Sequence, residues 1–355
     1  MQLRRTLQTV DCHAAGEPLR IVTGGMPALL GGTMLARRSY VAECLDDVRR
    51  LLMWEPRGHA DMYGCIVTPP VSVGATCGVL FMHNEGYSTM CGHGIIGLAT
   101  ALIETGQVAV GRAAEAEAGT SVSLAFDTPA GLVRAHAVVE SGRVRAVTMR
   151  NVASFVLDRR TVAVDGLGDV ETTIAYGGAF YAIVDAARAG LGEPPARAVP
   201  GPARTTGAPG ALIRLVDAAS DIKAAVLRAG EIVHPVERGI EGLYGVVAGW
   251  PPRESGADQT SLTVFADREV DRSPCGTCTS ALMAARWADG RLPLGAAFVN
   301  ESPIGTRFTG RLIEETRIGP YRAVVPEVTG SASITGFHTF VLDADDPLSE
   351  GFLLR

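Results

Sequence analysis

The sequence predicts an α+β fold of two similar halves, each a curved β-sheet wrapped around one apolar helix. The main observation is an internal repeat, because CGHGIIGLATALIETG (Cys91–Gly106) is matched in outline by CGTCTSALMAARWADG (Cys275–Gly290). Both segments precede an apolar stretch broken by a turn of the form acid, hydroxyl, Pro, any residue, Gly, at 127–131 and 301–305. Much of the remaining chain is short runs of β-branched and aromatic residues near turn-forming residues, which is typical of strands.

The first half is expected to span residues 1–150. Strands are predicted where β-branched and aromatic residues cluster, as in LRIVTGG (19–25) and CGVLFMH (77–83). The pattern LDDVRRLLMW (Leu45–Trp54) predicts an amphipathic helix between them. The central helix is predicted over 95–103, where the absence of charged residues suits a helix that is buried on all sides.

The second half is expected to span residues 151–340 and to repeat this order. A segment at 341–355 is expected to pack back on the first half. Helices are predicted at Ala218–Ala229 and, as the second central helix, at 279–288. The predicted strands share the same β-rich composition and are GAFYAIVDA (178–186), LYGVVAG (243–249), SLTVFA (261–266) and HTFVLDA (338–344).

Composition excludes several classes of protein. The 355 residues are 47% hydrophobic and 20% charged, which is typical of a globular protein large enough for two domains. A net charge of −6 without a basic tract argues against a nucleic-acid partner. No apolar run is long enough for a signal peptide or a membrane span, so we expect a cytoplasmic protein with reduced thiols and no membrane partner. The oligomeric state is left open, with a homodimer as one option.

The lysine content restricts the chemistry further. Lys223 is the only lysine, and it lies in SDIKAAVLRAG, a pattern typical of an amphipathic surface helix. Pyridoxal phosphate enzymes need a lysine Schiff base, so this class is disfavoured. No GxxxxGK[ST] phosphate-binding loop is present, which leaves no evident site for ATP chemistry.

The repeated cysteines, Cys91 and Cys275, indicate the chemistry. A cysteine at a helix N-terminus lies near the positive end of the helix dipole, so we expect a lowered pKa and an accessible thiolate. The adjacent Gly92 and Gly276 would let a ligand approach the backbone closely. Two such helix ends across a pseudo-twofold cleft would form an anion site suited to a carboxylate.

Two thiols on opposite faces of a carbon can invert its configuration. A bound amino acid would place its Cα between Cys91 and Cys275, where one thiolate removes the proton and the other thiol returns a proton from the opposite side. Helix N–H groups would stabilise the negative charge that develops on the carboxylate. This chemistry requires no cofactor.

Two further residues could contact the amino group of the substrate. Asp271 precedes Cys275 in DRSPCG, and the intervening Ser-Pro favours a turn toward the cleft. The alternative role for Asp271 is that of a turn or helix-entry residue. His93 could reach the same amine, or it could donate to a neighbouring loop from the start of its helix.

The segments around these cysteines resemble the proline racemase family, which includes hydroxyproline 2-epimerases and trans-3-hydroxy-L-proline dehydratases. MCGHGIIG (90–97) and DRSPCGT (271–277) are similar to its two signature segments, and similarity extends over essentially the whole chain. Other matching segments are HAAGEPLRIV (13–22), RGHADMYG (57–64), FMHNEGYSTMCGHG (81–94) and GGAFYAIVDA (177–186).

The resemblance implies the fold of diaminopimelate epimerase, with two pseudo-symmetric halves. It implies that Cys91 and Cys275 are the acid/base pair of a cofactor-independent enzyme. By position, Asp271 matches the amine contact, and a carboxylate clasp is formed by Gly92, His93, Gly276 and Thr277. The expected substrate is proline or a hydroxyproline, and no metal is expected.

The branch of the family is less clearly indicated. The dehydratase branch typically has Thr where this chain has Cys275, which favours racemisation or epimerisation. FMHNEGYSTMCGHG and GHADMYG nevertheless resemble the dehydratase branch more closely than the epimerases, so dehydration of trans-3-hydroxy-L-proline is the alternative. A ring hydroxyl could be recognised by His59, Asp61 or Tyr63.

Two other classes were weighed. Cys91-x-His93 and Cys275-x-x-Cys278 could supply zinc ligands, or CGTC could act as a redox pair. This is disfavoured because both clusters open apolar helices. A catalytically inactive binding protein is disfavoured because both cysteines and Asp271 are intact. The position of Cys278 usually holds a small residue such as Gly in the family, and the sequence offers no account of this cysteine.

Overall fold

The computed structural model describes residues 3–109, 119–195 and 210–354, and the chain forms two compact units. Unit 1 comprises Met1–Met149 and Gly330–Arg355, and unit 2 comprises Arg150–Thr329. The sequence analysis placed the first boundary after residue 150, one residue later. It also assigned residues up to 340 to the second half, whereas the structure assigns the chain from Gly330 onward to unit 1.

Unit 1 contains strands in the order β18–β1–β2–β3–β4–β6–β7, with the short β5 also paired to β4. The β2–β3 and β4–β6 pairs are parallel, and the others are antiparallel. The strands are β1 (Leu3–Ala14), β2 (Glu17–Gly24), β3 (Tyr63–Thr68), β4 (Cys77–His83), β5 (Tyr87–Ser88), β6 (Thr120–Thr128), β7 (Gly131–Glu140), β8 (Arg143–Arg150) and β18 (Ala332–Asp343).

Unit 2 repeats this topology with strands in the order β9–β10–β11–β12–β13–β15–β16–β17, and β14 also pairs with β13. Its parallel pairs, β11–β12 and β13–β15, stand at the equivalent places. The strands are β9 (Phe155–Val164), β10 (Gly168–Tyr176), β11 (Phe180–Asp185), β12 (Gly245–Trp250), β13 (Gln259–Phe265), β14 (Glu269–Asp271), β15 (Ala297–Glu301), β16 (Arg307–Ile318) and β17 (Tyr321–Gly330).

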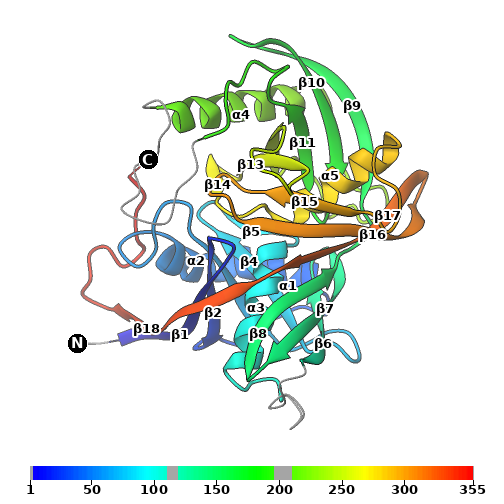
Figure 1. Cartoon of the computed structure of the whole chain (residues 1–355). Coiled ribbons are helices and arrows are strands. Elements are labelled where there is room, and N and C mark those ends of the chain that lie inside the picture. The colour runs from blue at the N-terminus through cyan, green and yellow to red at the C-terminus, as the bar shows by residue number, and fades with distance from the viewer. Residues whose placement is uncertain (1–2, 110–118, 196–209, 355) are drawn as a thin grey trace. The chain divides into compact units, whose positions relative to one another are not determined.

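The strands β9 and β18 explain why unit 1 contains two separate segments of the chain. β9 follows β8 of unit 1 in sequence but pairs with β10 of unit 2, where Figure 1 shows the two as long neighbouring strands. β18 follows β17 of unit 2 and pairs with β1 of unit 1 over Leu3–Ala14. The outer strand of unit 2, β9, thus comes directly after unit 1 in the sequence, and the outer strand of unit 1, β18, comes directly after unit 2.

A buried helix occupies the centre of each unit, as the sequence predicted. α3 (Gly92–Glu104) packs against β1, β2, β7 and β18, and every residue from Gly92 to Ile103 is buried. α5 (Gly276–Ala288) packs against β9, β10, β11 and β16, and it is buried from Gly276 to Ala285. The helix N-termini at Cys91 and Cys275 therefore occupy equivalent positions in the repeated topology.

The remaining helices cover the outer surfaces of the sheets. α1 (Met34–Cys44) and α2 (Asp46–Met53) pack on β4, and α4 (Ala211–Arg228) packs on β9 and β12. The prediction over Leu45–Trp54 corresponds to α2, whereas α4 begins seven residues before the predicted Ala218. α1 was not predicted because only Met34 and Val41 are buried, which leaves little apolar periodicity.

Candidate active site

Cys91 is the N-cap residue of α3. Its backbone is extended, with φ −144° and ψ 119°, and its sulfur accepts a hydrogen bond from the Gly94 N–H at 3.2 Å. The sulfur also lies 3.1 Å from Nδ1 of His93. Cys91 is only 4% exposed, so these two nitrogen groups are close neighbours of a buried sulfur.

His93 is held in place by an aromatic neighbour on β3. The rings of Tyr63 and His93 meet edge to face, with centroids 4.7 Å apart and an interplanar angle of 73°. The Tyr63 hydroxyl lies 2.6 Å from Oγ of Ser88, and all three side chains are buried. β3 and β5 therefore position a pair of hydroxyl groups beside the histidine that contacts Cys91.

Cys275 occupies the equivalent N-cap position of α5 but has a different backbone. Its φ of +56° is rare for a residue with a side chain, and its sulfur does not cap the helix. The Cys275 N–H donates instead to Oγ of Ser273 at 3.0 Å, and the Ser273 N–H donates to Oδ1 of Asp271 at 2.8 Å. Such conformations concentrate at functional sites, where the surrounding structure holds them in place.

Hydroxyl groups surround the sulfur of Cys275. Oγ1 of Thr277 lies 3.5 Å from it and the hydroxyl of Tyr181 lies 3.7 Å from it. Tyr181 and Thr277 are also hydrogen-bonded to each other at 2.7 Å. Burial raises the pKa of Tyr181 well above its ordinary value, so this side chain remains a neutral phenol.

The surroundings of Cys275 overturn the expectation of a lowered pKa for this thiol. Burial, followed by a hydrogen bond with Cys278 and the negative charge of Asp271, raises the pKa of Cys275 well above its ordinary value. The Thr277 hydroxyl acts in the opposite direction but is the smallest of these effects. Burial therefore has a larger effect on the pKa of Cys275 than the helix N-terminus has, and the thiol is the favoured form of this residue.

Asp271 lies at the end of β14 and is 3% exposed. Its position opposite Thr263 of β13 places the carboxylate in the segment that leads to Cys275. Since Oδ1 accepts the Ser273 N–H, Asp271 fixes the turn before the helix. This contact fits the turn role weighed from the sequence, and its negative charge also acts on Cys275.

Gly177, the first residue of the GGAFYAIVDA segment, lies in close contact with the start of α5. A Cβ at this position would lie 2.2 Å from the carbonyl oxygen of Thr277 and 2.7 Å from the Ala281 nitrogen. The β10–β11 turn therefore packs directly on the first turn of α5. Sequence reasoning identified this segment but missed Tyr181 within it, since the contact of Tyr181 with Cys275 depends on strand register.

Cys278 is buried completely and corresponds to Gly94 in the repeat. A Cβ at Gly94 would lie 2.4 Å from Cε1 of Phe81 and 3.1 Å from the sulfur of Cys91. Unit 1 thus has no room for a side chain at this position. Unit 2 has a second thiol there, which contributes to the raised pKa of Cys275.

Of the remaining four cysteines, Cys12, Cys65 and Cys77 are buried, whereas the prediction that Cys44 is also a buried small hydrophobic residue is wrong. Burial raises the pKa of Cys12 and of Cys77 to about 12, and the pKa of Cys65 is also well above its ordinary value. Such thiols remain neutral and pack as small apolar groups. Cys44 is exposed on the outer helix α1, and all seven cysteines are free.

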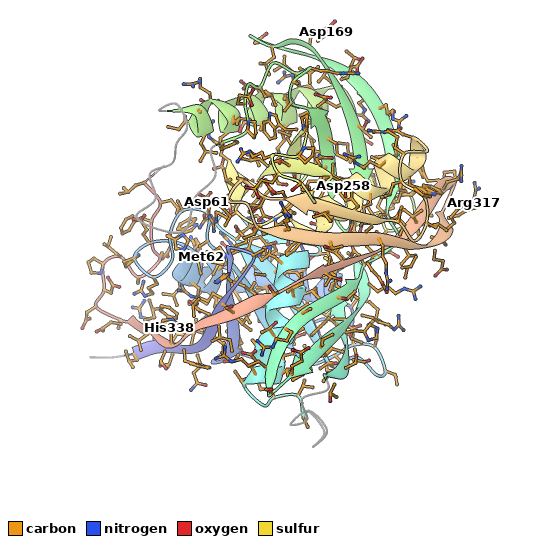
Figure 2. All side chains as sticks on the ribbon, viewed as in Figure 1. Asp61, Met62, Asp169, Asp258, Arg317 and His338 are labelled. Carbon is orange, nitrogen blue, oxygen red and sulfur yellow. The ribbon has the colours of Figure 1, made fainter. Side chains whose placement is uncertain are left out.

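The residues suggested for a ring hydroxyl lie in and beyond the loop that leads to β3. His59 is exposed, with Nδ1 only 2.6 Å from the Ala60 oxygen. Asp61, labelled in Figure 2, is partly exposed. Its φ is positive, at 61°. Of the three, Tyr63 is the one whose ring contacts His93.

Within residues 3–109, 119–195 and 210–354, no group of three or more His, Cys, Asp or Glu side chains is arranged to hold a metal ion. Over the same ranges, no helix has both the length and the hydropathy required to cross a membrane.

Comparison with known proteins supports the similarity noted from the motifs. A sequence model of the family described as proline racemase matches residues 9–353. A trans-3-hydroxy-L-proline dehydratase of Bacillus cereus is 44% identical over 361 residues, and a 4-hydroxyproline 2-epimerase of Streptosporangium roseum is 45% identical over 356 residues. Both alignments cover 100% of this chain and 100% of the relative.

A solved structure shows the same fold. A hydroxyproline epimerase from Agrobacterium vitis, crystallised with bound trans-4-hydroxy-L-proline, superposes with a TM-score of 0.86 at 31% identity. The match covers 100% of this chain and 97% of that chain. The α+β fold expected from the repeat and the resemblance is therefore confirmed.

Proposed function

Because this chain belongs to the proline racemase family, we propose that it is a hydroxyproline 2-epimerase that inverts Cα with Cys91 and Cys275. The observation that carries this proposal is the equivalence of the two cysteines. Each is the N-cap residue of the buried central helix in its unit, and each has a sulfur that is nearly inaccessible to solvent.

Substrate binding would use the N-termini of both central helices. The backbone N–H groups of Gly92 and His93, with those of Gly276 and Thr277, are the groups that a helix cannot satisfy internally. They would bind the carboxylate and stabilise the enediolate that forms when Cα loses its proton. Asp271 would accept a hydrogen bond from the ring ammonium.

The proton transfers follow from the two environments. Cys91, which is near the Gly94 N–H and His93, would act as the thiolate that takes the Cα proton. Cys275, whose thiol form is favoured, would donate its proton to the opposite face of Cα. The enzyme then holds a Cys91 thiol and a Cys275 thiolate, and the reverse reaction restores the first state. No cofactor takes part in these steps.

A substrate panel in deuterium oxide tests the proposal. The protein would be incubated with L-proline, trans-4-hydroxy-L-proline and trans-3-hydroxy-L-proline, and the Cα proton and optical rotation would be followed. We expect deuterium incorporation with inversion for a hydroxyproline. Recovery of every compound unchanged, with its original proton, would contradict the proposal.

Dehydration is the second candidate function because the 44% identical Bacillus cereus relative is a trans-3-hydroxy-L-proline dehydratase. Removal of the Cα proton by Cys91 would be followed by cleavage of the C3–O bond, with the hydroxyl leaving as water after protonation. The Tyr63–Ser88 pair supplies hydroxyl groups near His93 that could donate this proton. A cyclic imine formed from trans-3-hydroxy-L-proline, detected with an aldehyde-type reagent, would identify this activity.

The cellular setting follows from the chemistry. We propose the cytoplasm, because a two-thiol mechanism requires reduced cysteines, and all seven cysteines are free. Association into a homodimer remains a prediction that size-exclusion chromatography with light scattering would test.

A further inference from the structure

Cys278 is a buried thiol for which the proposed mechanism has no use. It lies three residues after Cys275, within the first turn of α5, and it is 0% exposed. Its thiol is one of the neighbouring groups that raise the pKa of Cys275. A Cys-x-x-Cys pair at a helix N-terminus is an arrangement in which thiol–disulfide chemistry is common.

The repeat shows that this second thiol is not required by the fold. The equivalent residue in unit 1 is Gly94, where a Cβ would collide with Phe81. In unit 2, by contrast, a second completely buried cysteine follows the candidate catalytic cysteine by three residues.

The local geometry allows these sulfurs to be joined. Residues three apart at a helix start have Cβ atoms about 5–6 Å apart, and a disulfide requires about 3.5–4.5 Å. The difference can be absorbed by Cys275, because its φ of +56° places it outside the helix. The first helical hydrogen bond, from the Thr279 N–H to the Cys275 oxygen at 2.8 Å, engages the Cys275 backbone and not its side chain.

We propose that Cys275 and Cys278 form a reversible oxidation site at which hydroperoxide inactivates the enzyme and Cys278 protects Cys275 from irreversible damage. The Cys275 thiolate attacks the peroxide, forming a Cys275 sulfenic acid and releasing hydroxide, which takes up a proton to give water. The Cys278 sulfur then attacks the Cys275 sulfur, and its thiol proton leaves with the hydroxyl as a second water. Both cysteines are oxidised to one disulfide, the peroxide is reduced, and an external thiol reverses the reaction.

The oxidation should be faster during turnover than at rest, which is a consequence of the proposed function. The resting Cys275 thiol reacts slowly because the thiolate is the nucleophile. Donation of its proton to the substrate leaves Cys275 as a thiolate in every cycle in which it serves as the acid. Peroxide would then trap this form, whereas Cys278 would not react by itself because it is completely buried.

Mass spectrometry of one peptide tests the proposal. Trypsin releases Ser273–Arg286, which contains both cysteines and excludes Cys91. The enzyme would be treated with hydrogen peroxide during turnover of trans-4-hydroxy-L-proline and trans-3-hydroxy-L-proline, quenched in acid and digested. We expect this peptide to lose two hydrogens, and we expect dithiothreitol to restore most of the activity. A Cys275 sulfinic acid without the internal disulfide, or a disulfide between Cys275 and Cys91, would overturn the proposal.

A Cys278→Ala variant distinguishes the protective role of Cys278 from catalysis by Cys275. We expect it to retain turnover, to accumulate Cys275 sulfinic acid under peroxide, and, relative to its own untreated activity, to recover at least severalfold less activity with dithiothreitol than the wild type. Cys278→Ser is the second variant if Ala disturbs folding, and it should behave in the same way. A Cys44→Ser control, which removes an exposed thiol, should respond like the wild type. Equal recovery by all variants would contradict a protective role for Cys278.

The readouts keep the two proposals distinct. An enzyme that inverts a hydroxyproline but never forms the Cys275–Cys278 disulfide would contradict only the oxidation site. A protein that forms the disulfide but exchanges no Cα proton would contradict the epimerase proposal and the turnover dependence.

Discussion

The two helix N-termini place a cysteine at the same position but surround it with different chemistry. In unit 1, the Gly94 N–H and Nδ1 of His93 lie within 3.2 Å of the Cys91 sulfur. In unit 2, Cys275 has hydroxyl groups, Asp271 and a second thiol as neighbours. The repeat therefore preserves the position of the cysteine, whereas its neighbours differ between the units and, in unit 2, contribute to a raised pKa of Cys275.

Replacing either cysteine should have the largest effect on the rate of inversion. We expect Cys91→Ser and Cys275→Ser each to lower the rate of inversion by about 10²–10⁴-fold, since one remaining base cannot protonate the far face. Polarimetry with the active hydroxyproline gives the rate, and Cys44→Ser provides a control at an exposed thiol. Wild-type inversion by either variant would refute the assignment of two bases.

Neutralising Asp271 should remove one difference between the surroundings of Cys275 and those of Cys91. Asp271→Asn removes a negative charge that raises the pKa of Cys275, so alkylation of Cys275 by iodoacetamide should begin at lower pH than in the wild type. Loss of a charged contact to the amine should also lower kcat/KM by about 10–100-fold. The matched control is Asp267→Asn, an exposed residue in the turn before β14. An unchanged alkylation profile in Asp271→Asn would show that the charge does not act on Cys275.

A glycine in unit 2 should be essential for packing around the second cysteine. Gly177→Ala would place a Cβ 2.2 Å from the Thr277 oxygen, and we expect this overpacking to cost about 1–3 kcal/mol of unfolding free energy. Thermal and urea unfolding measure the change. Gly32→Ala, where nothing lies within 4 Å of the added Cβ, should be nearly neutral. Equal stabilities of the two variants would mean that the β10–β11 turn does not pack on α5 as described.

Alkaline pH should destabilise both units through their buried thiols. The pKa values of Cys12, Cys65, Cys77 and Cys275 are all raised by burial. In the unfolded chain these thiols ionise near pH 8.5, so the folded form binds more protons above that pH. Stability is therefore retained below about pH 8.5 and falls as the pH rises. The melting temperature under reducing conditions should decrease from pH 8 to pH 10, and a constant value would contradict this linkage.

The repeat made the position of the cysteines predictable, but their environments depend on tertiary structure. Cys91, Cys275 and the uncharged run after Cys91 are visible in the sequence because helix starts and buried helices have strong local signals. Tyr181 reaches Cys275 through the register of β11, and burial rather than the helix N-terminus controls the pKa of Cys275. Neither effect has a local sequence signal.

The division between the units also depends on long-range pairing. The composition of HTFVLDA predicts a strand, yet nothing in it indicates that β18 pairs with β1 more than 300 residues earlier. The expected second half accordingly ran to residue 340, whereas the chain from Gly330 belongs to unit 1.

The most direct test of two opposed bases is deuterium exchange of each epimer by the single variants. With the hydroxyproline that the wild type inverts, Cys275→Ser should exchange the Cα proton of one epimer without inversion, and Cys91→Ser should exchange that of the other epimer. Exchange of the same epimer by both variants, or inversion by either at the wild-type rate, would contradict the account.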